Sequence, residues 1–298
     1  MYLTISMNPT LQKIICFSSI TKDAVNRSRQ HRFDVAGKGL NVCRVLSQLG
    51  KEAVHLTALG GETKSLFLEM SRREGIALQW VESGIPIRFC YTLIDKEDSS
   101  VTELIENTQP VVAETEGRFR EAYEELLPRC GAVVIAGTKA GGFSGELVPF
   151  MVRRAKEAGR KVTLDLWGED LLKSLPYSPD VIKPNLAEFA ATFFPDAAGI
   201  PGKEQVRALC LKLCREHRCA VVLTRGTEAV WYAEGEAFAE YSFTPVAETV
   251  NTTGSGDAFT AGLAAALGDG RSLREAVAEG VRCGSLNAGF LQVGTIRG

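Results

Sequence analysis

The chain has 298 residues, of which 45% are hydrophobic, and its 34 Lys and Arg against 36 Asp and Glu leave a formal net charge of −2. Such a chain has no global field that would hold a nucleic-acid backbone, so an anionic ligand must be met by a local group of side chains. Its length allows one large domain, with or without a small appendage, to fold without metal or disulfide bonds. The cysteines are irregularly spaced and residues 1–8 lack the pattern of a signal peptide, so we expect reduced thiols and a cytoplasmic protein without membrane or nucleic-acid partners.

Short apolar runs alternate with amphipathic helical windows through most of the chain. The predicted strands are residues 53–59, 132–136, 161–166, 181–183 and 219–224, and the predicted helices are residues 65–73, 116–127, 145–158 and 204–216. This alternation indicates an α/β fold in which a mostly parallel sheet is covered by helices on both faces, giving three αβα layers.

Two segments interrupt the alternation. Residues 11–35 and 85–110 contain short alternating strands, at 14–17, 31–33, 87–94 and 101–104, and no helical window. Because both segments flank the same early βα unit, we expect them to pair into one small sheet that stands off the main domain. We therefore predict an αβα domain of residues 1–10, 36–84 and 111–298, and a discontinuous β lid of residues 11–35 and 85–110.

The strongest local pattern is residues 251–267, NTTGSGDAFTAGLAAAL, where a polar turn leads into a helix of small and apolar residues. Gly254, Ser255 and Gly256 lie at the N-terminus of this helix, where unpaired backbone N–H groups and the helix dipole favour an anion. Asp257 has two interpretations. It either complements the helix dipole or accepts a proton from an attacking hydroxyl while the turn stabilises a transferring phosphoryl group.

Further motifs precede this turn in a fixed order: Asn8-Pro9, Asn26-Arg27, AGKGLNV at 36–42, TEL at 102–104, KPNLAE at 183–188 and TRG at 224–226. Over essentially the whole chain, these motifs and their order resemble those of the ribokinase-like (PfkB) carbohydrate kinases. Within that family it resembles the hexose-phosphate branch of 1-phosphofructokinase and tagatose-6-phosphate kinase. The resemblance implies a ribokinase-like fold, a kinase that uses ATP and Mg²⁺, and a homodimer formed through the lids.

On the nucleotide side, the resemblance assigns a role to each matching residue. Asp257 would be the catalytic base and Gly254, Ser255 and Gly256 the anion hole. Nucleotide contacts would come from Lys183, Asn185, Thr224, Gly226 and, near the adenine, Asn287, with Mg²⁺ held through water by Asn185 and Glu188. Asn and Glu spaced by three at a helix start do offer two oxygens to hydrated Mg²⁺, but the same pair is also typical of a capping box on a helix over 186–194.

On the acceptor side, Gly37, Lys38 and Asn41 match the family's first signature, and Glu103 lies in the lid motif. Arg27 and Arg88 fall where the branch presents cations to the phosphate of the sugar. A phosphorylated acceptor is favoured if these cations converge, because guanidinium groups bind phosphate oxygens in pairs. The alternative for each is a solvated surface charge.

Three acceptor-side positions depart from the branch. Gln12 replaces an Asp, Cys90 stands where a Lys or Asn is expected, and residues 136–140 read AGTKA in place of Ser-Gly-Ser-Leu-Pro. An amide loses the charge-assisted bonds that a carboxylate makes to hydroxyls, so these changes favour an altered acceptor.

The resulting hypothesis is an ATP-dependent kinase of a sugar phosphate of the fructose 1-phosphate, tagatose 6-phosphate or fructose 6-phosphate type. A kinase of an unphosphorylated sugar or nucleoside and a sensor that binds nucleotide or sugar phosphate without turnover stay open as alternatives. Cys210, Cys214, His217 and Cys219 match no zinc pattern, so we expect core packing there. We also expect Trp80, Trp167 and Trp231 to pack at element ends.

Overall fold

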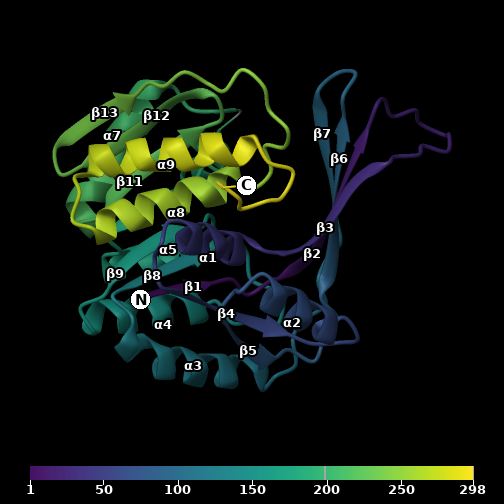
Figure 1. Ribbon diagram of the computed structural model, residues 1–298. Helices are drawn as coiled ribbons and strands as arrows, with labels where there is room; N and C mark the ends of the chain where they lie inside the picture. Colours follow the sequence, from purple (N-terminus) through teal and green to yellow (C-terminus); the bar gives the residue numbers. More distant parts are fainter. Residues whose placement is uncertain (198, 298) are drawn as a thin grey trace.

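The computed structural model describes residues 1–197 and 199–297 and contains two separate sheets. Within these residues, nine strands form the larger sheet in the order β13-β12-β11-β10-β9-β8-β1-β4-β5 (Figure 1). Their bounds are β1 Tyr2–Ile5, β4 Ala53–Leu59, β5 Leu78–Glu82, β8 Ala132–Ala136, β9 Lys161–Asp165, β10 Val181–Ile182, β11 Ala220–Arg225, β12 Glu228–Glu234 and β13 Ala237–Tyr241. Neighbouring strands run parallel from β11 to β5, while β12 and β13 form an antiparallel edge.

Helices cover both faces of this sheet, which confirms the predicted three-layer α/β fold. They are α1 Lys38–Gln48, α2 Lys64–Arg73, α3 Thr115–Leu126, α4 Leu147–Glu157, α5 Glu169–Ser174, α6 Leu186–Phe193, α7 Lys203–His217, α8 Ser255–Gly268 and α9 Leu273–Ala288, with short 3-10 turns at Leu127–Arg129 and Leu175–Tyr177. Strand side chains alternate between the faces: Val133 packs with α3 and α4, whereas Val134 packs with α1 and α8. A strand that is buried on both sides reads as a continuous apolar run, as these strands do.

Helix α8 is buried along most of its length between α1 and α9. Its packing against α9 is close because both helices carry glycine at the crossing. A Cβ on Gly262 would lie 2.7 Å from the Glu279 carbonyl oxygen, and a Cβ on Gly280 would lie 2.9 Å from the Phe259 ring. This explains why the helix reads as small and apolar on all sides, and it fixes the N-terminus of α8 at the edge of the sheet.

The second sheet projects from the main body as four strands in the order β3-β2-β6-β7 (Figure 1). Its strands are β2 Thr10–Phe17, β3 Gln30–Ala36, β6 Arg88–Asp95 and β7 Ser100–Ile105. We call this sheet the lid. Its central strands β2 and β6 are parallel because both leave the main body in the same direction, and each carries an antiparallel partner. The division of the chain into two domains at these points stays our prediction.

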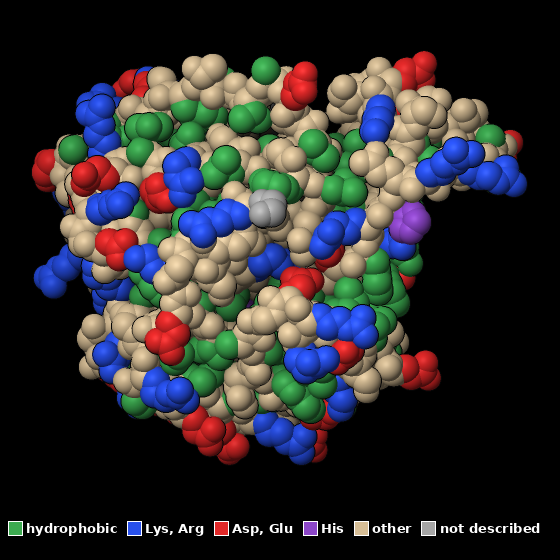
Figure 2. All heavy atoms as spheres, viewed as in Figure 1, with side chains coloured by type: hydrophobic (Ala, Val, Ile, Leu, Met, Phe, Trp, Pro, Cys, Tyr) green, Lys and Arg blue, Asp and Glu red, His purple; other side chains and the backbone are tan. Residues whose placement is uncertain are grey.

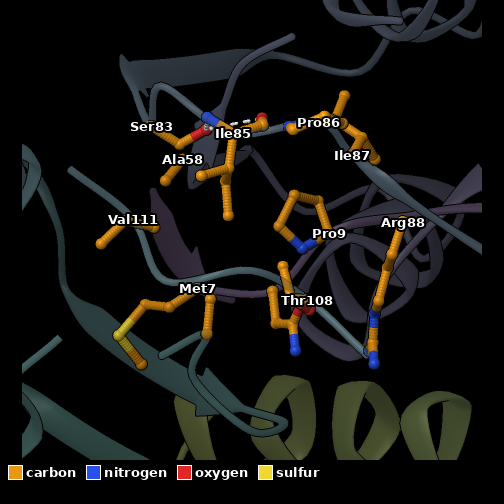
Figure 3. Close-up of a pocket in the computed structure, with 12 residues that line it drawn as sticks. Met7, Pro9, Ala58, Ser83, Ile85, Pro86, Ile87, Arg88, Thr108 and Val111 are labelled. Carbon is orange, nitrogen blue, oxygen red and sulfur yellow. Dashed lines mark hydrogen bonds between the residues drawn. The ribbon is translucent and has the colours of Figure 1, made fainter. Parts of the chain in front are cut away.

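The base of the lid is packed tightly (Figure 3). Met7, Pro9 and Ile85 surround a cavity of only about 10 Å³, while Arg88 extends away from these apolar side chains (Figure 3). Beside them, the Thr108 hydroxyl donates to Asn8 Oδ1 at 2.6 Å. Three of the chain segments that join the main sheet to the lid, near residues 7–9, 85–88 and 108–111, are therefore held together by direct contacts.

The hairpin of β12 and β13 was not predicted from sequence. Residues 228–241 are rich in Glu and Ala, which have low strand propensity, so no strand pattern stands out. Pairing with the buried strand β11 overrides this preference, and Gly235 with φ 58° allows the tight turn.

In the described residues, no helix combines the length and apolar character that a membrane span requires. The eight cysteines are free thiols with buried side chains.

Candidate active site

A cavity of about 530 Å³ lies between the carboxyl edge of the parallel strands and the inner face of the lid. It brings together residues from both sheets and from the starts of α1 and α8. The predicted site residues that line it are Gln12, Gly37, Lys38, Asn41, Arg88, Glu103, Lys183, Asn185, Glu188, Thr224, Gly254, Gly256 and Asp257. Motifs separated by more than 200 positions in the chain thus share one cavity, as expected where parallel strands end at the same edge.

A second cavity, of about 420 Å³, adjoins the first. The two share Thr224, Thr252 and Gly256, so they meet at the N-terminus of α8. The second cavity also contains the predicted residues Gly226 and Ser255. Its walls are largely apolar and come from Val230, Phe243, Val246, Phe259 and Val281. An apolar pocket joined to an anion-binding helix end suits a ligand with a flat ring and a charged tail.

The N-terminus of α8 is open toward these cavities. Gly254 is the N-cap with φ 84°, and no side chain among the described residues caps the helix. A Cβ at this position would be strained by the backbone and would lie 3.1 Å from the Gly294 nitrogen and the Val293 Cβ. The Ser255 N–H donates to the Thr252 carbonyl at 3.1 Å, so among the described residues the N–H groups of Gly256 and Asp257 are the ones left to meet an anion.

Asp257 lies in the first turn of α8 and is only 7% exposed. Its Oδ2 accepts a hydrogen bond of 2.7 Å from Asn41 Nδ2. Burial raises the pKa of Asp257 to about 6; Asp165 contributes in the same direction, against Lys38, Asn41 and Lys183. A carboxylate with a pKa near neutrality is suited to accept a proton at physiological pH.

Asp165 is a site residue that sequence reasoning missed. It ends β9, is 2% exposed, and lies 3.2 Å from Lys183 Nζ and 3.8 Å from Lys38 Nζ, while Thr260 Oγ1 donates to it at 2.7 Å. Burial tends to raise the pKa of Asp165, but Lys183 and Lys38 lower it overall, so it stays charged. The sequence offers one indication of this role. Asp165 is a carboxylate at the end of a predicted buried strand, and ligands of parallel sheets bind at the carboxyl ends of the strands.

Asp165 in turn lies beside both lysines of the cavity. It is the main reason that the pKa of Lys38 is raised well above its ordinary value; Asp257 and Glu188 add to this, against burial. Lys183 is buried and its ammonium group lies against Asp165. The cavity therefore has two fixed positive charges beside the N-terminus of α8.

Asn185 and Glu188 form a capping box, which is one of the two roles that the sequence indicates for this pair. Asn185 Oδ1 accepts from the Glu188 nitrogen at 2.8 Å, and Glu188 Oε2 accepts from the Asn185 nitrogen at 2.9 Å. Glu188 also faces the cavity, because its Oε1 accepts from Lys38 Nζ at 3.3 Å. Within residues 1–197 and 199–297, no three or more His, Cys, Asp or Glu side chains are placed to hold a metal ion.

Two predicted site residues line neither cavity. Arg27 is exposed in the loop between β2 and β3. Asn287 is fully buried: its amide donates to the Thr253 carbonyl at 3.1 Å and to Ser255 Oγ at 3.2 Å, and it accepts from the Thr295 nitrogen. Asn287 thus supports the turn before α8, and all of its polar atoms are used there.

The positions that depart from the family pattern do lie at the site. Gln12 and Cys90 line the main cavity, and Gln12 Nε2 donates to Thr92 Oγ1 at 2.7 Å. Trp167, expected to pack at an element end, is 46% exposed and lines a third cavity of about 180 Å³ together with Arg88. Trp167 follows the strand that ends in Asp165, so it does lie at an element end, but its indole is exposed at the carboxyl edge of the sheet instead of packed.

The open helix N-terminus, the buried carboxylate and the paired lysines define a phosphate-handling enzyme of the α/β class. Comparison with protein families identifies which one. The model described as pfkB family carbohydrate kinase matches residues 7–295. The chain therefore belongs to the PfkB family of carbohydrate kinases, as its motifs predicted, and this membership implies the use of ATP.

Several solved structures share the fold of this chain. The tetrameric inhibited form of phosphofructokinase-2 from Escherichia coli has a TM-score of 0.84 at 21% identity, covering 96% of this chain and 93% of that chain. A possible 1-phosphofructokinase from Thermotoga maritima has a TM-score of 0.84 at 22% identity, covering 96% and 91%. Arabidopsis thaliana ribokinase complexed with ribose and ATP has a TM-score of 0.74 at 18% identity, covering 98% and 94%. The fold is thus ribokinase-like.

Proposed function

We propose that this protein transfers the γ-phosphoryl group of ATP to a hydroxyl of a sugar phosphate of the fructose 1-phosphate, tagatose 6-phosphate or fructose 6-phosphate type. One observation carries the proposal: buried Asp257 lies at the open N-terminus of α8, in a cavity that also contains Lys38 and Arg88. A phosphoryl group in front of this helix would have a proton acceptor and fixed positive charges around it.

In this proposal the acceptor hydroxyl lies against Asp257. Asp257 takes the hydroxyl proton as the oxygen attacks the γ-phosphorus, and ADP leaves on the opposite side. The free N–H groups at the start of α8 stabilise the equatorial oxygens, and Lys38 and Lys183 offset the charge of the phosphates. The lid above the cavity limits access of water, which would otherwise accept the phosphoryl group.

The donor set at the start of α6 fits Mg²⁺. Mg²⁺ keeps several waters and is usually bound through one or two carboxylates together with the substrate phosphates. Glu188 and Asn185 offer a carboxylate and an amide oxygen beside the cavity, and both are engaged in the cap, so they would act through water. When bound, the ion neutralises charge on the nucleotide phosphates.

The acceptor end of the cavity supports a phosphorylated sugar. Lys38 and Arg88 line both the main cavity and the smaller one beside Trp167, so their charges converge. Gln12 gives its N–H to Thr92 and keeps its oxygen as an acceptor for a sugar hydroxyl. The position of Arg27 outside the cavity favours the second candidate, a kinase of an unphosphorylated sugar, because one expected phosphate ligand is missing from the chain's own site.

We also propose that the lids of two copies pair in a homodimer. The face of the lid that points away from the cavity carries Phe89 stacked on Tyr91, with Leu104 paired to Tyr91 across the strands. Leu104 is 52% exposed, and every residue of the edge strand β7 is exposed. An open edge strand with an apolar face is a surface that proteins normally cover.

A coupled assay of ADP release with a panel of acceptors tests the proposed function. We expect turnover with at least one of fructose 1-phosphate, fructose 6-phosphate and tagatose 6-phosphate. Activity confined to an unphosphorylated sugar or nucleoside would replace the first candidate by the second. Tight binding of ATP and a sugar phosphate without turnover would indicate a sensor instead.

A further inference from the structure

Arg44 is a buried arginine on α1 that has no part in the proposed reaction steps. It is 6% exposed, and its guanidinium group makes four hydrogen bonds. Nη1 donates to Asn41 Oδ1 at 3.1 Å and to the Val293 carbonyl at 3.0 Å; Nη2 donates to the Val35 carbonyl at 2.7 Å; and Nε donates to Glu74 at 2.7 Å. Acceptors from four separate parts of the chain thus hold this planar group in one orientation.

The orientation of Arg44 decides that of Asn41. An arginine only donates hydrogen bonds, so the Asn41 atom facing it must be the oxygen. The other end of the amide, Nδ2, then points at Asp257 Oδ2, 2.7 Å away. The hydrogen bonds run in one direction, from Arg44 through Asn41 to the carboxylate in the first turn of α8.

We propose that Arg44 is a positioning residue that keeps the Asn41 amide N–H, and not its carbonyl oxygen, against Asp257. The inference rests on the proposed function, in which Asp257 is the base. Without Arg44 the amide is free to turn over, and a carbonyl oxygen against Asp257 would repel the ionised form that accepts the proton. Arg44 thereby keeps the base both oriented and deprotonated without touching a substrate.

The sign of the effect follows from the groups around this pair. The charged and titratable groups that face Asp257 or Arg44 are Lys38 and Cys43 of α1, Asp165 of β9, Lys183 after β10, Glu74 after α2, Asp34 of β3 and His55 of β4. Burial raises the pKa of Asp257, and the Asn41 hydrogen bond is among the influences that lower it. Loss of that bond raises the pKa further, so the activity that requires ionised Asp257 begins at higher pH.

The pH dependence of kcat/KM for the acceptor tests the inference. The double variant Arg44→Met/Glu74→Gln removes both members of the ion pair, so that no charge is left buried alone. We expect its acid limb to move to higher pH by about one unit, the order of shift that a hydrogen bond to a charged group causes. The matched control Arg120→Met/Glu116→Gln removes an ion pair on α3 that does not line the cavity, and its acid limb should coincide with that of the unmodified protein.

A second pair of variants separates positioning from a structural role. In an Asn41→Ala background, the Arg44→Met/Glu74→Gln change should produce no further shift, because Arg44 acts through Asn41. The inference would be overturned if the Arg44→Met/Glu74→Gln change shifted the acid limb fully in the Asn41→Ala background. It would also be overturned if the same change left the acid limb unmoved in the protein that keeps Asn41. If the double variant does not fold, Arg44→Gln replaces it: a Gln amide can either donate or accept, so it does not fix which end of Asn41 faces Asp257, and an unmoved acid limb there also overturns the inference.

These outcomes are distinct from failure of the proposed function. If the unmodified protein transfers no phosphoryl group to any acceptor, the proposed function is wrong and this inference falls with it. If the unmodified protein is active and the variants keep its acid limb, only the role of Arg44 is wrong.

Discussion

At the scale of single residues, the site combines groups that are costly to bury with groups that offset the cost. Asp257 and Asp165 are both buried carboxylates near each other, and their surroundings separate their behaviour. Lys183 and Lys38 lower the pKa of Asp165, whereas burial raises that of Asp257 to about 6. Asp165 therefore stays charged beside the lysines, whereas Asp257 is able to exchange a proton near neutral pH.

The raised pKa of Asp257 links activity to stability. A carboxyl group whose folded pKa exceeds its unfolded value stabilises the fold while it is protonated, and this contribution is lost as pH rises from the ordinary value of 3.8 through about 6. We expect Asp257→Asn to lower kcat by at least ~10². The same change should raise the free energy of unfolding at pH 7.5 by roughly 1–3 kcal/mol.

Urea unfolding and the kinase assay, each over a range of pH, check both effects. The stability gain should vanish at acid pH, where the unmodified carboxyl is protonated as well. Asp269→Asn is a matched control at the other end of α8, where the carboxylate forms only a surface pair with Lys51. A variant Asp257→Asn with unchanged kcat would contradict the role of Asp257 as the base.

At the scale of elements, the candidate site depends on the position of the N-terminus of α8. Its burial between α1 and α9 holds its first turn at the cavity, and Gly254 and Gly256 leave the backbone uncovered there. Gly256 has open space around its Cα, since a Cβ would meet nothing within 4 Å. The glycine at this position is therefore not explained by packing within the protein.

We expect Gly256→Ala to separate folding from function. Alanine should raise the free energy of unfolding by about 0.5 kcal/mol, because it restricts the unfolded chain and favours helix. The added methyl group projects toward the anion site, so kcat/KM for ATP should fall at least ~10-fold. Gly117→Ala, in the first turn of α3 and equally unobstructed, is the control: it should stabilise without affecting the kinetics. Equal kinetics for both variants would argue against an anion site at α8.

Elements with strong local patterns could be predicted from the sequence, and the others could not. The helices over 116–127 and 204–216 and the strand 132–136 match α3, α7 and β8 to within about a residue or two, because their apolar spacing is clear. The β12–β13 hairpin could not be predicted, because only its pairing with β11 stabilises a Glu- and Ala-rich segment as strand.

The site was predictable where a motif carries it. The turn at 254–257 and the Asn185–Glu188 pair are local in sequence, and so is the chemistry expected of them. The contacts of Asp165 with Lys38 and Lys183 and those of Arg44 with Asn41 join different elements. No local pattern reports such contacts, since they exist only once the strands and helices are assembled.

At the scale of the whole molecule, positive and negative side chains are mixed over the surface. Figure 2 shows Lys and Arg interspersed with Asp and Glu over the face drawn, in keeping with the net charge of −2. In the proposed function, the attraction for phosphate comes from the cavity, where the N-terminus of α8 and two lysines meet. Salt should therefore affect substrate binding more than it affects the fold.

The proposed lid dimer gives a prediction at this scale. We expect Leu104→Lys to weaken association at least ~30-fold, because it places a charge on the apolar face that the dimer would bury. Sedimentation velocity over a concentration series measures this. Val25→Lys is the control, because Val25 is 77% exposed in the lid loop and lies outside that face. A monomeric unmodified protein, or a dimer that tolerates Leu104→Lys, would contradict pairing through the lid.

The order of elements along the chain has a consequence for synthesis on the ribosome. Every strand of both sheets precedes α8, and α8 and α9 together cover one face of the main sheet. A nascent chain that has already paired all its strands still exposes the apolar residues that will meet these helices, and it lacks Asp257. If Asp257 is the base, as we propose, activity and protection from aggregation arise in the same late step, and we expect incomplete chains to be inactive and to be targets of chaperones.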